Sequence, residues 1–422
     1  MTMRATPVVC AFGLISLLGT SRARTRYAPV DGRATPTATA ESKATSRDAA
    51  MPALDNSSDY GGFGGAQAES IPADSPRWQL GPKATVTDYL GRRSLALEDD
   101  PATLKDFEMT DGVVDVDMAG NGARGFYNIS FRRRSKEEME LVYLRPHKTG
   151  LEDAQQYTPV FRGTGAWQIY NGPGFTAAVD IPRDVWFHVR LVIAGAQAQL
   201  YVSNMTVPSL VMNDLKTGVR QGGVGFYGVH VSNVEIRRTP PAVWVRHEPA
   251  MAPATIVKWR LSPSMDALER DSERPLSKSE ADSMKWQEVT AEPPGFVVIN
   301  HYRKGPDLIP TFARDFSRRL EPQKGTQLVY ARTTIAADRD RVKKLNIGYS
   351  DEVSVFLNGR ILYRGRSAQR FRDPGFLGIV NPENDAVYLP LKKGRNELVL
   401  ALSELTGGWG FICRFDNMEG IH

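Results

Sequence analysis

The segment DEVSVFLNGRILY, residues 351–363, decides the fold class of this chain. Its first half, which includes Phe356, is rich in β-forming residues, and a second such stretch begins at Ile361. Asn358-Gly359 separates the two stretches, and this dipeptide favours a tight hairpin because both central residues of the turn need a positive φ. The segment therefore predicts two antiparallel strands joined by a two-residue turn.

A second segment, LKKGRNELVLAL at 391–402, follows the same logic. Gly394 marks a turn, and Leu398, Leu400 and Leu402 then alternate with other residues. This alternation indicates an antiparallel strand with one buried face. Together the two segments resemble the galactose-binding-like jelly roll, in which such a hairpin and such a strand recur. The resemblance implies a glycan-related protein outside the cytoplasm, because that domain accompanies many sugar-active bacterial enzymes.

Length and charge set the broad class of the protein. The chain has 422 residues, a length that predicts two or three domains. Its 53 basic residues are scattered among 48 acidic ones, for a net charge of +5. The short basic cluster at 132–134 has the character of a strand end in solvent. This charge pattern does not favour binding to nucleic acid.

The first residues have the order of an export signal. Arg4 precedes an apolar run at 8–18 that is too short to span a bilayer. Ser21 and Ala23 then provide the small residues of a signal-peptide cleavage site. The alternative is a buried N-terminal strand. We expect residues 1–23 to be a signal peptide, no integral membrane segment in the mature chain, and a periplasmic, extracellular or cell-surface location. Removal of that segment takes away Cys10 and leaves Cys413 as the single cysteine of the given sequence, so no intrachain disulfide is expected.

The rest of the chain divides into three parts. Residues 24–76 are rich in small and polar residues without apolar periodicity, so a disordered linker is predicted there. The fold class is all-β, with two antiparallel β-sandwiches (jelly rolls) at 77–240 and 241–422 and a boundary at Pro240-Pro241. Strands in the first sandwich are expected at 112–118, 127–133, 139–145, 166–170, 185–194, 199–203 and 231–236. In the second sandwich, 264–284 is expected to be a loop with a short helix.

The segment DVWFHVRLVIAG at 184–195 is the most informative part of the first sandwich. Four apolar side chains share one face of the expected strand, while Trp186, His188 and Arg190 share the other. This strand and GGVGFYG at 222–228 resemble concanavalin-like or laminin-G-like sandwiches. The further motifs LRPH, QQYTP and WQIY, at 144–147, 155–159 and 167–170, resemble exported proteins of the 3-keto-disaccharide hydrolase (family-16-like) group.

The candidate binding site is a groove on the concave face of the first sandwich. Tyr143, Arg145 and His147 leave their strand in the same direction, and sugars need this mixture of flat rings and hydrogen-bonding side chains. The alternative is an ordinary solvated sheet face. The candidate substrate-binding residues are Arg145, His147, Gln156, Tyr157, Gln168, Tyr170, His188 and Arg190.

Catalytic groups are harder to identify. The Glu-x-Asp-x-x-Glu set of retaining glucanases is absent from the sequence, and Glu138 and Glu140 are interpreted as a solvated strand start. Asp153 and His147 are weak candidates for acid and base. No cofactor motif is found, and a structural Ca²⁺ stays open although no dense acidic loop supports it.

The function predicted from these observations is that of an exported carbohydrate-recognition protein whose partner is an oligo- or polysaccharide. A glycoside hydrolase of the 3-keto-disaccharide hydrolase type is one alternative, and a surface adhesion or scaffold protein is another. Trp409, within the glycine-rich segment 407–411, is expected to pack under its own turns instead of stacking on a sugar. Two co-directed carboxylates would favour the hydrolase, an aromatic groove the lectin, and a flat apolar patch the scaffold.

Overall fold

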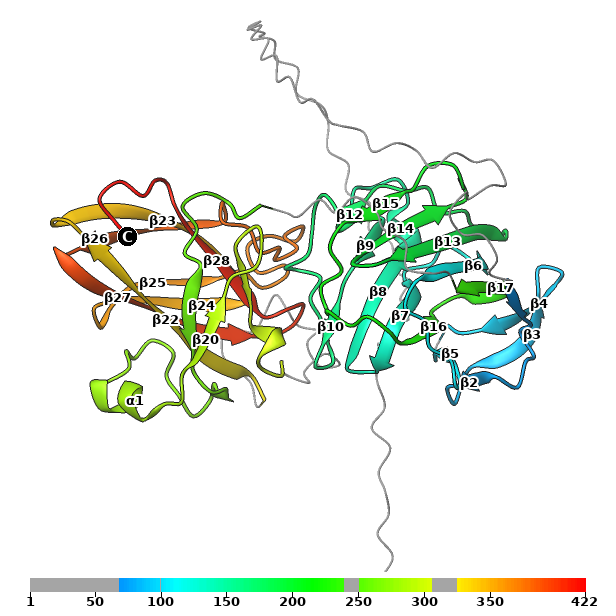
Figure 1. The fold of residues 1–422 in the computed structure, drawn as a ribbon, viewed down its shortest axis with the longest axis horizontal. Helices are drawn as coiled ribbons and strands as arrows, with labels where there is room; N and C mark the ends of the chain where they lie inside the picture. Colours follow the sequence, from blue (N-terminus) through cyan, green and yellow to red (C-terminus); the bar gives the residue numbers. More distant parts are fainter. Residues whose placement is uncertain (1–67, 99, 239–249, 306–324) are drawn as a thin grey trace, which may run out of the picture.

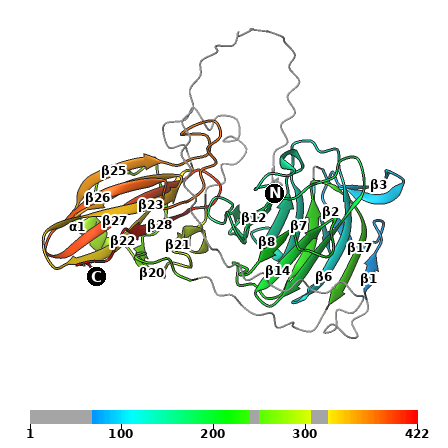
Figure 2. The same cartoon turned by 90° about the horizontal axis from the view of Figure 1, so that it is seen from above.

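The computed structural model describes residues 68–98, 100–238, 250–305 and 325–422. Two β-sandwich units lie side by side in both views, one made from the described residues up to 238 and the other from those after 249 (Figures 1 and 2). Their strands pair in antiparallel fashion, which confirms the predicted all-β fold class. The expected signal peptide and the boundary at 240 and 241 lie outside the described residues.

Two sheets form the first sandwich. In spatial order, sheet A contains β15 (Leu210–Met212), β14 (Gln197–Val202), β13 (Phe187–Ala194), β6 (Gly112–Ala119), β17 (His230–Arg238), β4 (Arg92–Ala96) and β3 (Thr85–Tyr89), with β1 (Glu69–Ile71) also paired to β17. Sheet B contains β11 (Thr164–Gly165), β10 (Val160–Phe161), β8 (Glu138–Leu144), β7 (Tyr127–Ser135), β16 (Gly223–Tyr227), β5 (Ala102–Leu104) and β2 (Trp78–Leu80), with β9 (Gln155–Tyr157) beside β8 and β12 (Thr176–Ala177) beside β9.

The core of the first sandwich lies between these sheets because their strands alternate apolar and polar residues. Sheet A contributes Val116 and Leu191, and sheet B contributes Ile129 and Val142, all buried in one apolar cluster. Neighbours in sequence point the other way, so the outward faces carry the polar side chains. The candidate residues of sheet A and sheet B therefore belong to two different outer faces.

The second sandwich also has two sheets. Sheet C contains β20 (Gln287–Thr290), β18 (Lys258–Leu261), β22 (Gln327–Ala337), β27 (Gly394–Glu404), β24 (Glu352–Leu357) and β25 (Arg360–Arg366), with β19 (Met265–Asp266) beside β22. Sheet D contains β21 (Phe296–Val298), β28 (Gly410–Phe415), β23 (Arg341–Ser350) and β26 (Asp385–Leu391).

The predicted hairpin is present between β24 and β25. Asn358 and Gly359 have φ values of 51° and 78°, as a tight turn with two positive φ angles requires. The partner of β24 on its other side is β27, where Val355 lies opposite Leu400. The two sequence segments that indicated a jelly roll are therefore neighbours in sheet C.

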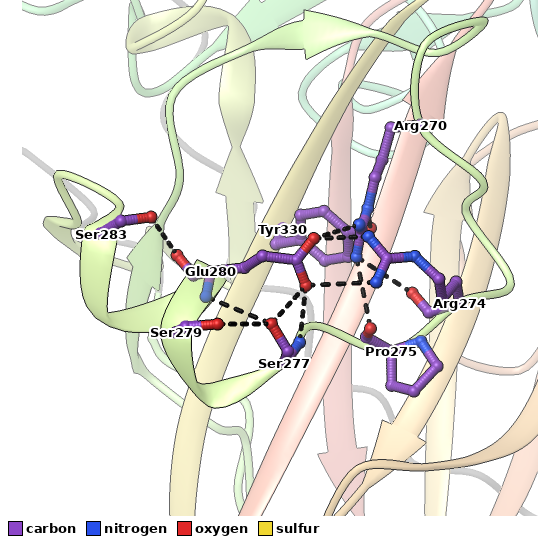
Figure 3. Close-up of polar contacts among 8 residues, drawn as sticks. All are labelled: Arg270, Arg274, Pro275, Ser277, Ser279, Glu280, Ser283 and Tyr330. Carbon is purple, nitrogen blue, oxygen red and sulfur yellow. Dashed lines mark hydrogen bonds and ion pairs between the residues drawn. The ribbon is translucent and has the colours of Figure 1, made fainter.

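The segment before β20 covers the outer face of sheet C. Its short helix α1 (Lys278–Ser283) confirms the predicted short helix, and Ser277 and Glu280 cap it reciprocally. Figure 3 shows Arg270 between this helix and the sheet, donating to the Glu280 carboxylate and to the Tyr330 hydroxyl, each at 2.7 Å. Leu276 packs nearby on a small apolar cluster around Tyr330. The outer face of this sheet is thus occupied by the chain itself.

β1 corrects the predicted start of the first sandwich. It lies within the segment expected to be a linker, pairs with the Val234–Ile236 part of β17, and buries Ile71 in the core. Three residues with a single buried apolar side chain are too short to show a period in the sequence. The folded unit therefore begins before Ile71 and not near residue 77.

Residues 166–170 correct a second expectation. They form a turn, not a strand, and the turn joins the two sandwiches. The Gln168 N–H donates to the Gly407 carbonyl at 2.9 Å, and the Gln168 carbonyl accepts from the Val380 N–H at 2.8 Å. Its side chain accepts from the Ser350 hydroxyl and donates to the Leu377 carbonyl, both at 3.0 Å. The backbone of this turn therefore bonds to the second sandwich instead of extending a sheet of the first.

Candidate functional site

The eight predicted binding residues do not share one face. The structure places them in four environments: Arg145, His147 and Gln156 at the outer face of sheet B; Tyr157 in the core; Gln168 and Tyr170 at the junction of the sandwiches; and His188 and Arg190 on the outer face of sheet A. The expectation of a single groove is therefore corrected. Its physical reason is that long-range strand pairing, which local alternation does not encode, decides the sheet to which a strand belongs.

Arg145 is the centre of the group on sheet B. Its Nη2 donates to the Tyr143 hydroxyl at 2.8 Å and to Gln156 Oε1 at 2.7 Å, while its Nη1 donates to Asp153 Oδ2 at 2.6 Å. Tyr143 also donates to Gln156 Oε1 at 2.7 Å, and burial raises the pKa of Tyr143 to about 12. The guanidinium fork is filled by protein groups, so Arg145 positions its neighbours.

Phe126 is the aromatic side chain that the sequence analysis missed. It is 43% exposed, and its ring lies edge-on to Tyr143 with the centroids 5.1 Å apart. His147 approaches the same ring at 6.3 Å, and the Arg145 guanidinium carbon lies 5.8 Å from its centroid. Phe126 precedes β7 and falls outside any alternating strand pattern, so only the fold could bring it to this place. We call Phe126, Tyr143, Arg145, His147 and Asp153 the Phe126 cluster.

A row of side chains extends this cluster across sheet B. Tyr227, Asn128, Tyr143 and Gln156 lie opposite one another on β16, β7, β8 and β9. Residues in such register point to the same face. Asn128 and Tyr227 are partly exposed on this face, whereas Tyr143 and Gln156 are buried and hydrogen-bonded within the protein.

The two catalytic candidates lie in the Phe126 cluster. His147 is in the 3-10 helix η1 (Pro146–Lys148), its Nδ1 is buried without a partner among the described residues, and burial together with Arg124 and Arg145 lowers its pKa. Asp153 Oδ2 accepts from Arg145 and Lys148. Among the described hydrogen bonds and ion pairs, no second carboxylate contacts Asp153. The geometry therefore does not favour a two-carboxylate mechanism here.

Glu140 corrects another expectation. It is fully buried and not part of a solvated strand start. Its carboxylate accepts from the Tyr157 and Thr217 hydroxyls, each at 2.6 Å, and burial raises the pKa of Glu140. Tyr157 in turn accepts from the Lys216 N–H at 2.7 Å. The two side chains form an internal network that fastens the 214–221 segment to sheet B, so Tyr157 is not available to a sugar.

His188 lies in a charged ladder on sheet A. Its Nδ1 contacts Asp117 Oδ1 at 2.8 Å and its Nε2 contacts Asp115 Oδ1 at 3.0 Å, while Arg190 Nε donates to Asp115 Oδ1 at 2.6 Å. The hydrogen bonds to Asp115 and Asp117 raise the pKa of His188 to about 9. At neutral pH both ring nitrogens carry protons and both are engaged, so His188 cannot act as a base.

This ladder makes a pH prediction. Because the folded pKa of His188 lies above the ordinary value of 6.5, its contribution to stability is complete below about pH 6.5 and is lost as pH rises through about 9. We expect the His188→Gln variant to be less stable than the wild type at pH 6 and to show a flatter decline between pH 7 and 10. Urea unfolding across this range measures the effect, with His422→Gln as the control. The same decline in His188→Gln and wild type would contradict the assignment.

None of the His, Cys, Asp and Glu side chains described form a group of three or more that could hold a metal ion. In the same part of the chain, no helix has the length and apolar character needed to cross a membrane.

Comparisons with known proteins give structural neighbours only. No protein-family model and no curated protein matches the chain. It is similar to the carbohydrate-binding module CBM66 from Bacillus subtilis, at 13% identity over 39% of this chain and 93% of that chain, with a TM-score of 0.27. It is also similar to a Bacillus licheniformis β-glucanase, at 10% identity over 42% and 99%, with a TM-score of 0.26. A family 35 carbohydrate-binding module from an environmental isolate gives 18% identity over 22% and 68%, with a TM-score of 0.17. At TM-scores this low, none of these similarities carries an argument about the site.

Proposed function

We propose that the protein binds an oligo- or polysaccharide on the outer face of sheet B, at the Phe126 cluster. The observation that supports this most is the exposed Phe126 ring beside a fixed set of polar groups. Sugar rings have apolar C–H faces that pack on aromatic rings, and hydroxyl edges that need donors and acceptors. Tyr143 lies 5.1 Å from that ring between centroids, and the Asn128 amide donates to the Phe126 carbonyl at 2.9 Å.

The cluster is also rigid, which favours recognition because little side-chain entropy is lost on binding. Arg145 holds Tyr143, Gln156 and Asp153, and Gln156 Nε2 donates to the Trp167 and Tyr170 carbonyls at 2.8 Å each. The groups offered to a ligand are then the Phe126 ring, His147, Lys148 and the free edge of Asp153. In this proposal Arg145 is a positioning residue for the site.

Glycan binding with the Phe126→Ala variant tests the proposal. The purified chain is first screened on a glycan array, and the best neutral ligand is then titrated by calorimetry. Loss of the buried apolar ring face is expected to cost about 1.5–3 kcal/mol, so affinity should fall about tenfold or more. The matched control is Tyr388→Ala, which removes a 64% exposed aromatic side chain from sheet D. Equal affinity of Phe126→Ala and wild type would place the sugar elsewhere.

A glycoside hydrolase would need catalytic groups in the same cluster. It needs a group that delivers a proton to the leaving oxygen and a second carboxylate across the sugar. Asp153 already accepts from Arg145 and Lys148, and the described part of the cluster contains no other carboxylate. The geometry therefore supports binding more than turnover.

A further inference from the structure

Two hollows adjoin each other along the segment between β15 and β16. The first has a volume of about 260 Å³ and the second of about 430 Å³. Both are lined by Gly218, Val219 and Arg220, so this tripeptide is their common wall. We call the pair the 218–220 trough. It is separate from the Phe126 cluster, with which it shares no lining residue.

The first hollow spans the junction between the two sandwiches. Glu292, from the second sandwich, lines it together with Lys216 and Asp214 of the first. The Lys216 ammonium lies 2.8 Å from Asp214 and 3.5 Å from Glu292, and Glu292 accepts from the Tyr170 hydroxyl at 2.6 Å. These charges satisfy one another. They fix the shape of the hollow, and the charge of Lys216 is already neutralised by these two carboxylates.

Arg220 is the cation that remains. It is exposed and has no hydrogen bond or ion pair with any described residue, although it lines both hollows. Arg134, 64% exposed at the second hollow, pairs with Glu138 at 3.5 Å. Glu108 accepts from Gln221 at 2.8 Å in the same hollow. Asp111 pairs with Arg132 of the first hollow and Glu138 with Arg134 of the second, so Arg220 is the lining cation that no described carboxylate neutralises.

The lining also limits the chemistry of the ligand. Among the described residues no aromatic side chain lines either hollow, so stacking on a sugar face does not contribute from this part of the chain. An arginine fork matches the two oxygens of a carboxylate or a sulfate. From the free fork of Arg220 and the joined hollows, we propose that the 218–220 trough binds an acidic saccharide through Arg220, where the saccharide class rests on the proposed function. The site itself does not involve the Phe126 cluster.

Calorimetry with the full chain tests the trough. The probes are tetrasaccharides of galacturonate, the same tetramer with methyl-esterified carboxyls, and a sulfated galactose tetramer. We expect binding of at least one acidic tetramer and at least tenfold weaker binding of the neutral ester. Arg220→Gln should weaken the acidic ligand about tenfold or more, since a hydrogen bond to a charged group is lost. Arg220→Glu should weaken it further. Comparison of the affinities for the galacturonate and the sulfated galactose tetramers shows whether the site prefers a carboxylate or a sulfate group.

The matched control is Arg360→Gln, which removes the same charge from the exposed start of β25. It should change affinity for the acidic tetramer less than twofold. Equal losses in Arg220→Gln and Arg360→Gln would show non-specific attraction and overturn the proposal. So would equal affinity for the acidic and esterified tetramers, or no binding of either acidic probe. Binding of the best neutral array ligand by Arg220→Gln separates the two proposals, because loss of Arg220 should leave that affinity unchanged.

Discussion

The Trp409→Ala variant is expected to lower the free energy of unfolding of the second sandwich by about 3–5 kcal/mol, the usual cost of removing a buried tryptophan. Trp409 is fully buried in the core of that sandwich, and its carbonyl accepts from the Ile299 N–H at 2.8 Å. Its indole packs in the apolar cluster that includes Phe411 and Tyr349. Alanine would leave a cavity that these neighbours cannot fill. Chemical unfolding followed by far-ultraviolet circular dichroism measures the loss.

Two comparisons sharpen this prediction. Tyr388→Ala removes an exposed aromatic side chain of the same sandwich and should change stability by less than about 0.5 kcal/mol. Neutral-glycan affinity should be the same in both variants, because Trp409 is far inside the core and not part of the Phe126 cluster. A Trp409→Ala protein with near-wild-type stability but weakened glycan binding would move the site to the second sandwich.

The burial of Trp409 confirms its interpretation as a core residue. The adjacent Gly407 and Gly408, however, pack against a turn of the first sandwich that the local sequence does not identify. A side chain at Gly407 would lie 2.2 Å from the Gln168 side chain, and one at Gly408 would lie 2.7 Å from Ala166. Both glycines also have positive φ values, of 96° and 119°. Glycine there allows close approach of a turn from the other sandwich. Local sequence indicated tight packing without identifying the segment that packs.

Strands and hairpins were predictable because their signals are local. The alternation around β13, the Asn358-Gly359 turn and the strand β27 all depend on neighbours within a few residues. The sheet to which each strand belongs depends on distant pairing, such as β13 with β6. The sequence therefore locates Arg145 and His188 in the right segments but predicts one groove for both, although Arg145 follows β8 of sheet B and His188 lies in β13 of sheet A.

Two buried charged residues, Glu140 and Arg132, also show that local sequence does not reveal contacts with distant segments. Glu140 was expected in solvent because it starts a strand, yet Thr217, far along the chain, covers it. Arg132 was expected in solvent with Arg133 and Arg134, but a β-bulge changes the alternation. The pairing of β7 with β16 and with β8 shifts register around this point, and Arg132 has a φ of 45°. Its side chain is thereby directed into the protein.

Arg132 makes the second large prediction. Its guanidinium and the Asp111 carboxylate, each 1% exposed, form an ion pair at 3.0 Å. Arg132 also donates to the Thr110 carbonyl at 3.1 Å and to the Gly195 carbonyl at 2.5 Å. Arg132→Met keeps most of the volume but leaves Asp111 buried without its cation and these carbonyls without their donors. We expect it to lower the free energy of unfolding by about 3–5 kcal/mol.

Three further variants separate the pair from a general effect of arginine removal. Arg134→Met, two residues away and 64% exposed, should change stability by less than about 0.5 kcal/mol. Adding Asp111→Asn to Arg132→Met removes the uncompensated charge while keeping an acceptor for the Gly195 N–H, which bonds Asp111 at 3.1 Å. The double variant should therefore recover part of the loss. Urea unfolding of the wild type, Arg132→Met, Asp111→Asn and the double variant completes a double-mutant cycle. Additive losses from Arg132→Met and Asp111→Asn would mean that the pair contributes no coupling, and that the bulge is held by the backbone contacts of Arg132 alone.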